Sequence, residues 1–371
     1  MRIALLFEFP TLSGGEYSML AIVERLGEAG IELVALAPPG GRLAEALEHH
    51  GIPPVDWSVR DGNGRRVDRE PLLDRLDELL DRVSPDLVHA NSLSMGRLTG
   101  ALARRTGRAA TAHLRDIVSL SAAAIEELNA NRRLIAVSQA TRDHHVDQGL
   151  DAARTVVIHN GIEVAGFPTA AGRERLREQL GLPAAALLVA TIGQVCLRKG
   201  QDVLAEAAAR CGMALPEVHF LLVGERYSTK TESIEFERAI HEQFARAGLS
   251  DRFHPLGFRD DVPELLDEID IVVHPAQQEP LGRVLLEASA SGRAIIATRV
   301  GGTPEILDHD ESALLVPPGD PAALAEAIEQ LAGDPTRRSR LGTTARERVA
   351  ERFGIEPAAA GLVAAWRQAI G

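Results

Sequence analysis

Short apolar runs alternate with amphipathic segments along the first half of the chain. The apolar runs read as buried strands, at 2–9, 31–35, 87–90, 109–113, 134–137 and 156–159. Segments with a 3.6-residue apolar period separate them and predict helices at 16–29, 42–48, 71–83, 96–105 and 122–129. Strands that alternate with helices in this way predict a parallel, doubly wound sheet.

The second half repeats the pattern. Its strand-like runs lie at 187–192, 219–223, 253–256, 269–274, 294–298 and 313–316. Between the two series, 161–172 lacks periodicity and contains Pro168, which places the hinge there. We therefore expect an α/β protein with two facing Rossmann-like domains, 1–165 and 166–355, whose ligand loops line one cleft. A last helical segment at 356–371 has an apolar face that includes Trp366.

Composition narrows the class of protein. The net charge of −13 argues against a nucleic-acid partner. The two cysteines, Cys196 and Cys211, suit a reducing compartment. Apolar runs stay short of the ~18 residues that a membrane span needs. The first ten residues include Glu8 and read as a strand rather than a signal peptide. These features predict a cytoplasmic enzyme.

Two carboxylates near the C-terminal end, Glu279 and Glu287, flank seven residues in a strand–loop–helix pattern. Glu279 falls in the loop after the apolar run at 269–274, and Glu287 falls one to two turns into the helix. The N-terminus of such a helix suits an anion, and a carboxylate beside it suits sugar hydroxyls. Together they indicate a nucleotide sugar. The alternative is that Glu279 only favours the helix dipole and Glu287 is a solvated surface residue.

The order Glu-Pro-x-Gly-x4-Glu resembles the E-x7-E signature of family 4 of the retaining glycosyltransferases (glycosyltransferase group 1). Further segments that are similar to motifs of this family follow in the family's order, at 13–16, 157–161, 193–200, 257–262, 298–307 and 313–325. The resemblance implies the GT-B fold, with an acceptor-binding domain at 1–165 and a nucleotide-sugar-binding domain at 166–355. It also implies that the helix at 356–371 crosses back to the N-terminal domain.

The resemblance implies roles for individual residues. His113 would contact the transferred sugar, Glu279 its hydroxyls and Glu287 the ribose diol. We expect the catalytic residues to be His113, Lys199 and Glu279. The donor-binding residues would be Gly14, Gly15, Arg198, Lys199, Phe258, Arg259, Leu281, Gly282, Arg283 and Glu287.

Each of these positions also has a plainer reading. A lone histidine at a strand end, as at His113, is otherwise structural, and the Gly14-Gly15 pair also suits a tight turn. Arg198 and Lys199 could lie in a solvated loop. Lys199 is, however, one of only two lysines among 40 basic residues, which favours a specific role for its compact charge. Gln194 departs from the family, which usually has arginine at that place.

No cofactor and no metal are expected. Asp308-His-Asp310 formally matches a D-x-D metal motif, but it follows a short helix where aspartate is a common turn former. The remaining histidines lack metal-ligand spacing.

The predicted function is retaining transfer of a sugar from a nucleoside diphosphate sugar to a hydroxyl of a small-molecule or glycan acceptor. UDP is favoured over GDP as the nucleotide of the donor. The resemblance implies that the acceptor attacks from the same face as that from which the leaving group departs. We expect the acceptor to contact the loops at 9–15, 57–70 and 114–121. The sequence assigns no shape to 61–66, which lies within the second of these loops. A nucleotide-sugar 2-epimerase and a non-catalytic nucleotide-sugar binder are the alternatives. Membrane docking is not favoured, but a basic cluster leaves it open; its members are Arg97, Arg104, Arg105 and Arg108.

Overall fold

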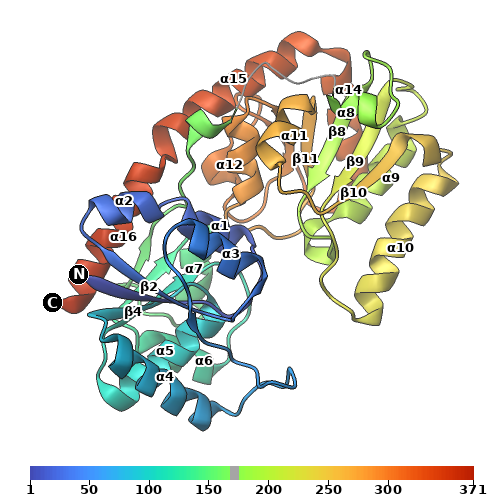
Figure 1. The fold of residues 1–371 in the computed structure, drawn as a ribbon. Coiled ribbons are helices and arrows are strands. Elements are labelled where there is room, and N and C mark those ends of the chain that lie inside the picture. The colour runs from blue at the N-terminus through green and yellow to red at the C-terminus, as the bar shows by residue number, and fades with distance from the viewer. Residues whose placement is uncertain (168–174) are drawn as a thin grey trace. The chain divides into compact units, whose positions relative to one another are not determined.

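The computed structural model describes residues 1–167 and 175–371, so Pro168 of the predicted hinge lies outside the described residues. The chain forms two compact units (Figure 1). Unit 1 comprises Met1–Gly161 and Ile355–Gly371, and unit 2 comprises Ile162–Gly354. The first division falls four residues before the predicted boundary at 165, and the second falls one residue before 355.

Unit 1 contains a sheet of seven strands in the order β3-β2-β1-β4-β5-β6-β7, with every pairing parallel. The strands are β1 Arg2–Leu6, β2 Glu32–Ala37, β3 Val55–Asp56, β4 Leu87–Ala90, β5 Ala110–Leu114, β6 Arg133–Ala136 and β7 Thr155–Val157. Helices cover both faces of a parallel sheet, which explains why the central strands read as continuous apolar runs. The edge strand β3 has only two residues, too few to give a periodic signal.

The helices of unit 1 are α1 Gly14–Leu20, α2 Val23–Glu28, α3 Gly41–His49, α4 Arg69–Val83, α5 Leu93–Thr106, α6 Ala122–Asn129, α7 Gln139–Asp147 and α16 Ile355–Ile370. Although α16 ends the chain, its apolar face lies in the same core as β1 and α2 (Figure 1). Trp366 on this face is fully buried. The last helix is therefore part of the core of unit 1.

The predicted helix at 16–29 is wrong as a single element, because the structure divides it into α1 and α2. The Ser18 hydroxyl donates to the Gly14 carbonyl at 2.6 Å, a local bond that bends helices. The Ile22 amide then bonds the Met19 carbonyl, three residues back, at 3.3 Å. Helix α7 was not predicted because its residues are mostly polar. The Ser138 side chain accepts from the Thr141 amide and caps its start.

Unit 2 contains six strands in the order β10-β9-β8-β11-β12-β13, again all parallel. They are β8 Leu187–Ile192, β9 Val218–Val223, β10 Phe253–Gly257, β11 Ile271–His274, β12 Ala294–Thr298 and β13 Leu314–Val316. The helices are α8 Arg175–Gln179, α9 Gln201–Cys211, α10 Thr231–Arg246, α11 Val262–Glu268, α12 Arg283–Ala290, α13 Thr303–Ile306, α14 Pro321–Gly333 and α15 Pro335–Arg352. Short 3₁₀ turns lie at Val164–Gly166, Leu197–Lys199 and Ser250–Arg252.

Both sheets have the strand order of Rossmann-like folds. The first strand lies inside the sheet, the next two strands lie on one side of it, and the later strands lie on its other side. The predicted pair of doubly wound parallel sheets is therefore confirmed. In such sheets ligands bind at the carboxyl ends of the strands, next to the point where the order reverses. These ends are at β1 and β4 in unit 1 and at β8 and β11 in unit 2.

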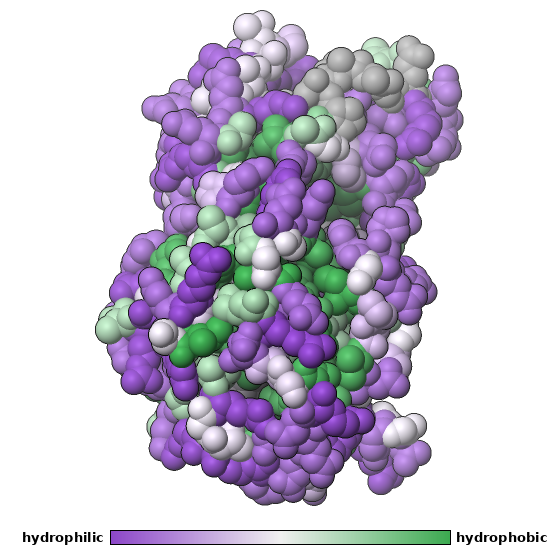
Figure 2. All heavy atoms as spheres, turned by 60° about the vertical axis from the view of Figure 1, so that its left-hand side comes forward, coloured by the Kyte–Doolittle hydropathy of each residue, from purple (hydrophilic) through white to green (hydrophobic). Residues whose placement is uncertain are grey.

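Hydrophilic residues cover most of the face drawn in Figure 2. The basic cluster of unit 1 is neutralised, because each of its arginines forms an ion pair with a carboxylate. The pairs are Arg97 with Glu127, Arg104 with Glu126, Arg105 with Asp74, and Arg108 with Asp77. These pairs remove the main argument for docking on an anionic membrane. Among the described residues, no helix is long and apolar enough to cross a bilayer.

Candidate functional site

The Glu279 carboxylate is held by two side chains at the carboxyl edge of the unit 2 sheet. Its Oε2 atom lies 2.5 Å from Lys199 Nζ and 2.7 Å from His274 Nε2. Lys199 ends the 3₁₀ turn after β8, and His274 is the last residue of β11. Both donors bind the same oxygen. Glu279 Oε1 has no hydrogen-bond partner among the described residues, so it is available to a ligand hydroxyl.

Electrostatics keep this carboxylate ionised. Burial alone would raise the pKa of Glu279, but Lys199 and His274 outweigh burial and hold that pKa well below its usual range. Burial and the Lys199 charge lower the pKa of His274, so its ring is neutral. A neutral ring beside an ionised carboxylate donates its Nε2 hydrogen. His274 thus positions Glu279, a role that sequence reasoning missed.

Two glycines let the loops of this site approach closely. Gly200 has φ 66°, and a Cβ there would lie 2.0 Å from the Pro275 carbonyl oxygen. Gly282 has φ 100°, and a Cβ there would lie 2.8 Å from Leu285 Cδ1 and 3.3 Å from Glu279 Cγ. Gly282 is the N-cap of α12, and the first amides of a helix have no partner within it. Beside the buried Leu281, this helix start offers N–H groups to an anion.

Glu287 lies in the second turn of α12 and pairs with Arg283, its Oε1 atom 2.8 Å from Arg283 Nε. Burial raises the pKa of Glu287, while Arg283 acts in the opposite direction. Glu287 is not the solvated surface residue of the alternative reading, since its side chain is only 16% exposed. The ion pair holds one largely buried carboxylate in the second turn of α12.

The other predicted donor residues of unit 2 lie at the same sheet edge. Arg198 is exposed, and its carbonyl accepts from the Gln277 amide at 2.8 Å, which ties the β8 loop to the β11 loop. Phe258 and Arg259 follow β10, and Arg259 Nε donates to Asp261 at 2.7 Å. Arg259 is therefore held in place by an acid before any ligand binds.

Gln194 stands where the family usually has arginine. Its backbone carbonyl accepts from the side-chain amide of Gln201 at 2.9 Å.

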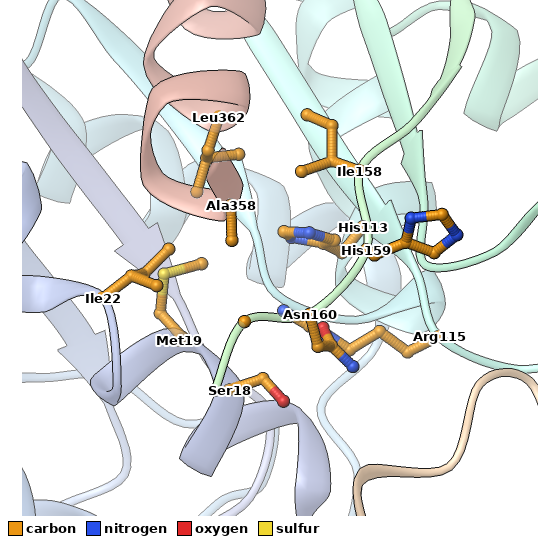
Figure 3. Close-up of a pocket in the computed structure, with 11 residues that line it drawn as sticks. Ser18, Met19, Ile22, His113, Arg115, Ile158, His159, Asn160, Ala358 and Leu362 are labelled. Atoms are coloured by element: carbon orange, nitrogen blue, oxygen red, sulfur yellow. The ribbon is translucent and has the colours of Figure 1, made fainter. Parts of the chain in front are cut away.

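His113, near the end of β5, lies in unit 1 and is 4% exposed. Its Nδ1 atom lies 2.8 Å from Nε2 of His89 on β4. Figure 3 shows the His113 ring lining a small pocket together with Arg115 and Asn160. Helix α16 contributes Ala358 and Leu362 to the same pocket. Sequence reasoning missed His89, which lies two residues after Leu87 in an apolar run that reads simply as core.

Gly14 and Gly15 open α1 at the carboxyl end of β1, also in unit 1. A Cβ on Gly15 would lie 2.9 Å from Arg115 Cδ. Arg115 donates to both Asn91 and Asn160, at 2.9 Å each, and so ties the ends of β4, β5 and β7 together. Gly15 therefore makes room for Arg115, while the Ser13–Glu16 capping box fixes the start of the helix.

The predicted site residues thus form two groups. Lys199, Glu279 and the start of α12 meet in unit 2, and His113 shares the carboxyl edge of the unit 1 sheet with Gly14 and Gly15.

The aspartates of the D-x-D segment are both paired with arginine. Asp308 Oδ2 lies 2.5 Å from Arg348, and Asp310 Oδ1 lies 2.6 Å from Arg337. Asp310 has φ 61°, a left-handed turn conformation that aspartate tolerates. Within 1–167 and 175–371, no group of three or more histidine, cysteine or acidic residues is arranged to hold a metal ion.

Comparison with protein families matches nearly the whole chain. Residues 172–348 match the model "Glycosyl transferases group 1", and residues 12–165 match "Glycosyltransferase Family 4". The Glycosyltransferase Family 4 match ends at residue 165, four residues past Gly161, where the first part of unit 1 ends. The other match lies wholly within unit 2.

Individual relatives agree with this match. A D-inositol 3-phosphate glycosyltransferase of Streptomyces bingchenggensis is 32% identical over 247 residues, which cover 66% of this chain and 54% of the relative. The chain therefore spans about half the length of that curated relative. Anabaena Alr3699/HepE, solved in complex with UDP-glucose, is 26% identical and superposes with a TM-score of 0.87 over 98% of this chain and 99% of that one.

A sucrose-phosphate synthase of Thermosynechococcus elongatus shares the fold, with 23% identity and a TM-score of 0.83 over 99% of this chain and 98% of that one. The two parallel sheets, the two family matches and these neighbours agree. The chain belongs to the group 1 glycosyltransferases, which have the GT-B fold.

Proposed function

We propose that the protein is a retaining glycosyltransferase that moves a sugar from a UDP-sugar to a hydroxyl of a small-molecule or glycan acceptor. The observation that carries the proposal is the ionised Glu279 carboxylate, held by Lys199 and His274 beside the start of α12. This arrangement puts a cation, helix amides and a carboxylate that accepts hydrogen bonds from hydroxyls within one site. A nucleoside diphosphate sugar needs these three groups. The solved complex of Anabaena Alr3699/HepE with UDP-glucose supports the choice of donor.

In this proposal unit 2 binds the donor. The amides of Leu281 and Gly282 and the side chains of Arg198 and Lys199 contact the diphosphate, because helix starts and cations both stabilise phosphate oxygens. Glu287, oriented by Arg283, accepts from the ribose hydroxyls. The segment at 258–259 contacts the base. Glu279 Oε1 accepts from hydroxyls of the transferred sugar, while Oε2 stays with Lys199 and His274.

The reaction breaks the bond between the anomeric carbon and the phosphate oxygen, whose electrons stay with the departing UDP. The acceptor oxygen forms the new bond on the same face and passes its proton to the phosphate. Lys199 stabilises the negative charge that grows on UDP, which is the main contribution a preorganised cation can make. Glu279 acts as a hydrogen-bond acceptor for the sugar and not as a nucleophile.

Unit 1 provides His113 and the acceptor loops. The segment at 61–66 has a defined turn, because Asp61 Oδ1 accepts from the amides of Asn63 and Arg65 at 2.9 Å each. Arg66 reaches back to Glu8 at 3.4 Å, so this turn is tied to the end of β1. We propose that this turn contacts the acceptor.

The test is incubation of the purified protein with UDP-[14C]glucose and an acceptor panel, followed by NMR of the anomeric configuration of the product. We expect a glycoside with the configuration of the donor. An epimerised nucleotide sugar would support the 2-epimerase instead. UDP-glucose binding without turnover on any acceptor would support the non-catalytic binder. An inverted product would contradict retention.

A further inference from the structure

The two histidines of unit 1 form a chain of hydrogen bonds that begins on the last helix. Trp366 Nε1 on α16 donates to His89 Nδ1 at 3.2 Å, and His89 Nε2 lies 2.8 Å from His113 Nδ1. Thr111 Oγ1 also lies 2.8 Å from His89 Nδ1. Trp366 and His89 are 277 residues apart in the chain, yet both are fully buried. The order of donors and acceptors in this chain follows from one member that can only donate.

The indole N–H has no acceptor capacity, so His89 Nδ1 must be the unprotonated nitrogen. Burial lowers the pKa of His89 to about 3, so the ring is neutral and carries its single proton on Nε2. That proton points to His113 Nδ1, which must therefore accept. Burial, Arg115 and His89 lower the pKa of His113 as well. A neutral His113 whose Nδ1 accepts carries its proton on Nε2.

We infer that Trp366 sets the tautomer of His113 through His89, so that His113 presents an Nε2–H donor to the pocket and cannot act as a base there. Trp366 and His89 are positioning residues, since they act only through His113. The recipient of the hydrogen bond is an oxygen of the ligand; its identity as a sugar oxygen rests on the proposed function. The tautomer itself does not depend on that function.

Without the indole N–H, the order of donors and acceptors along His89 and His113 should no longer be fixed. Without it, His89 Nδ1 can carry the proton and donate to Thr111 Oγ1, which is 2.8 Å away. His89 Nε2 then becomes an acceptor, and His113 turns its proton to Nδ1. The His113 atom that faces the pocket would change from donor to acceptor. Phenylalanine in place of Trp366 removes the indole N–H and keeps an aromatic ring, but it is smaller than the indole and leaves space at a fully buried position.

The test uses full-length protein labelled with ¹⁵N-histidine, whose two-bond ¹H–¹⁵N spectra distinguish protons on Nδ1 from protons on Nε2. His113 is assigned by the loss of its peaks in His113→Asn. We expect Nε2 protonation of His89 and His113 in the wild type, and Nδ1 protonation of at least part of the His113 population in Trp366→Phe. The matched control is Thr111→Val, which removes the other contact of the same nitrogen but keeps the indole donor. Its His113 should have the wild-type tautomer.

In transfer assays Trp366→Phe should lower kcat at least ~10-fold, as loss of a preorganised donor does. Its affinity for UDP should stay within about 2-fold, because the α12 site belongs to unit 2. An Nδ1 proton on wild-type His113, or an unchanged tautomer in Trp366→Phe, overturns the inference. If Trp366→Phe does not fold, the wild-type and Thr111→Val spectra still show whether His113 carries its proton on Nε2. Absence of any transfer activity refutes the proposed function and leaves the spectra to decide this inference separately.

Discussion

Lys199 Nζ lies 2.5 Å from Glu279 Oε2, so the cation predicted to meet the donor phosphate is ion-paired with the carboxylate predicted to meet the donor sugar. The two predicted roles therefore depend on each other. A buried charge that loses its partner is strongly destabilised. A change at either position alters the ionisation and orientation of the other, and the substitutions below are interpreted with that coupling in mind.

Replacement of Lys199 tests the phosphate contact. We expect Lys199→Ala to lower kcat/KM by roughly 10²-fold or more, because the leaving phosphate loses a preorganised charge and Glu279 loses its strongest partner. Steady-state kinetics with the donor varied will measure this. Lys230→Ala is the matched control, because Lys230 is the only other lysine and is exposed at the N-cap of α10. Equal activity of the two variants would contradict the assignment.

The two glutamates should differ in kinetic effect. Glu279 is expected to act mainly in the transition state, so Glu279→Gln should lower kcat strongly. Glu287 is expected to hold the ribose, which changes little in the reaction, so Glu287→Gln should mainly raise the donor KM. Loss of a charged hydrogen bond of ~1.5–3 kcal/mol corresponds to roughly a 10- to 150-fold rise. Circular dichroism will check the fold. The reverse kinetic pattern would mean that the motif is structural.

His274 should matter through the orientation of Glu279. His274→Ala removes the N–H that binds Glu279 Oε2 at 2.7 Å, and we expect kcat to fall roughly 10-fold or more, since a hydrogen bond to a charged group contributes ~1.5–3 kcal/mol. His274→Gln keeps an N–H donor and should recover most of the activity. A structural role in packing alone would give similar losses in both variants, because neither keeps the imidazole ring.

Stability should decrease as the pH falls below about 6.5, the usual pKa of histidine. The pKa of His89 is lowered from 6.5 to about 3 by burial and by Arg115. Between these values the unfolded chain binds a proton that the folded state does not, so the free energy of unfolding falls as the pH falls. One such group contributes ~1.4 kcal/mol per pH unit. Denaturant titrations from pH 7 to pH 5 should show a shallower fall for His89→Gln, and an equal slope would refute this origin.

Transfer should not require a divalent ion. The carboxylates of Asp308 and Asp310 are each paired with an arginine, and the phosphate charge can instead be met by Lys199, Arg198 and the start of α12. Activity measured after dialysis against EDTA should equal that of the untreated protein. Activity that disappears with EDTA and returns with Mg²⁺ or Mn²⁺ would show that the prediction is wrong.

The sequence alone was sufficient for the strands of the two sheets other than β3, since buried parallel strands need apolar residues on both faces and so read as unbroken apolar runs. It also placed Glu279 in a loop and Glu287 in a helix, because Pro280 and Gly282 interrupt the chain between β11 and α12. Features without a periodic signal were missed. Strand β3 is too short and α7 too polar, and the break between α1 and α2 depends on one hydroxyl at Ser18.

The partners of the site residues were decided by tertiary structure. Lys199 and Glu279 meet because β8 and β11 are neighbours in the sheet, and Gly200 and Gly282 let their loops come close. His274 orients Glu279 only because it ends β11 at the carboxyl edge of the sheet, where Glu279 also lies. His89 reads as one polar residue in an apolar run, and Trp366 as one apolar residue of the last helix. Hydrogen bonding between residues so distant in the chain leaves no local pattern, so only the packing of α16 against the sheet shows that one orders the other.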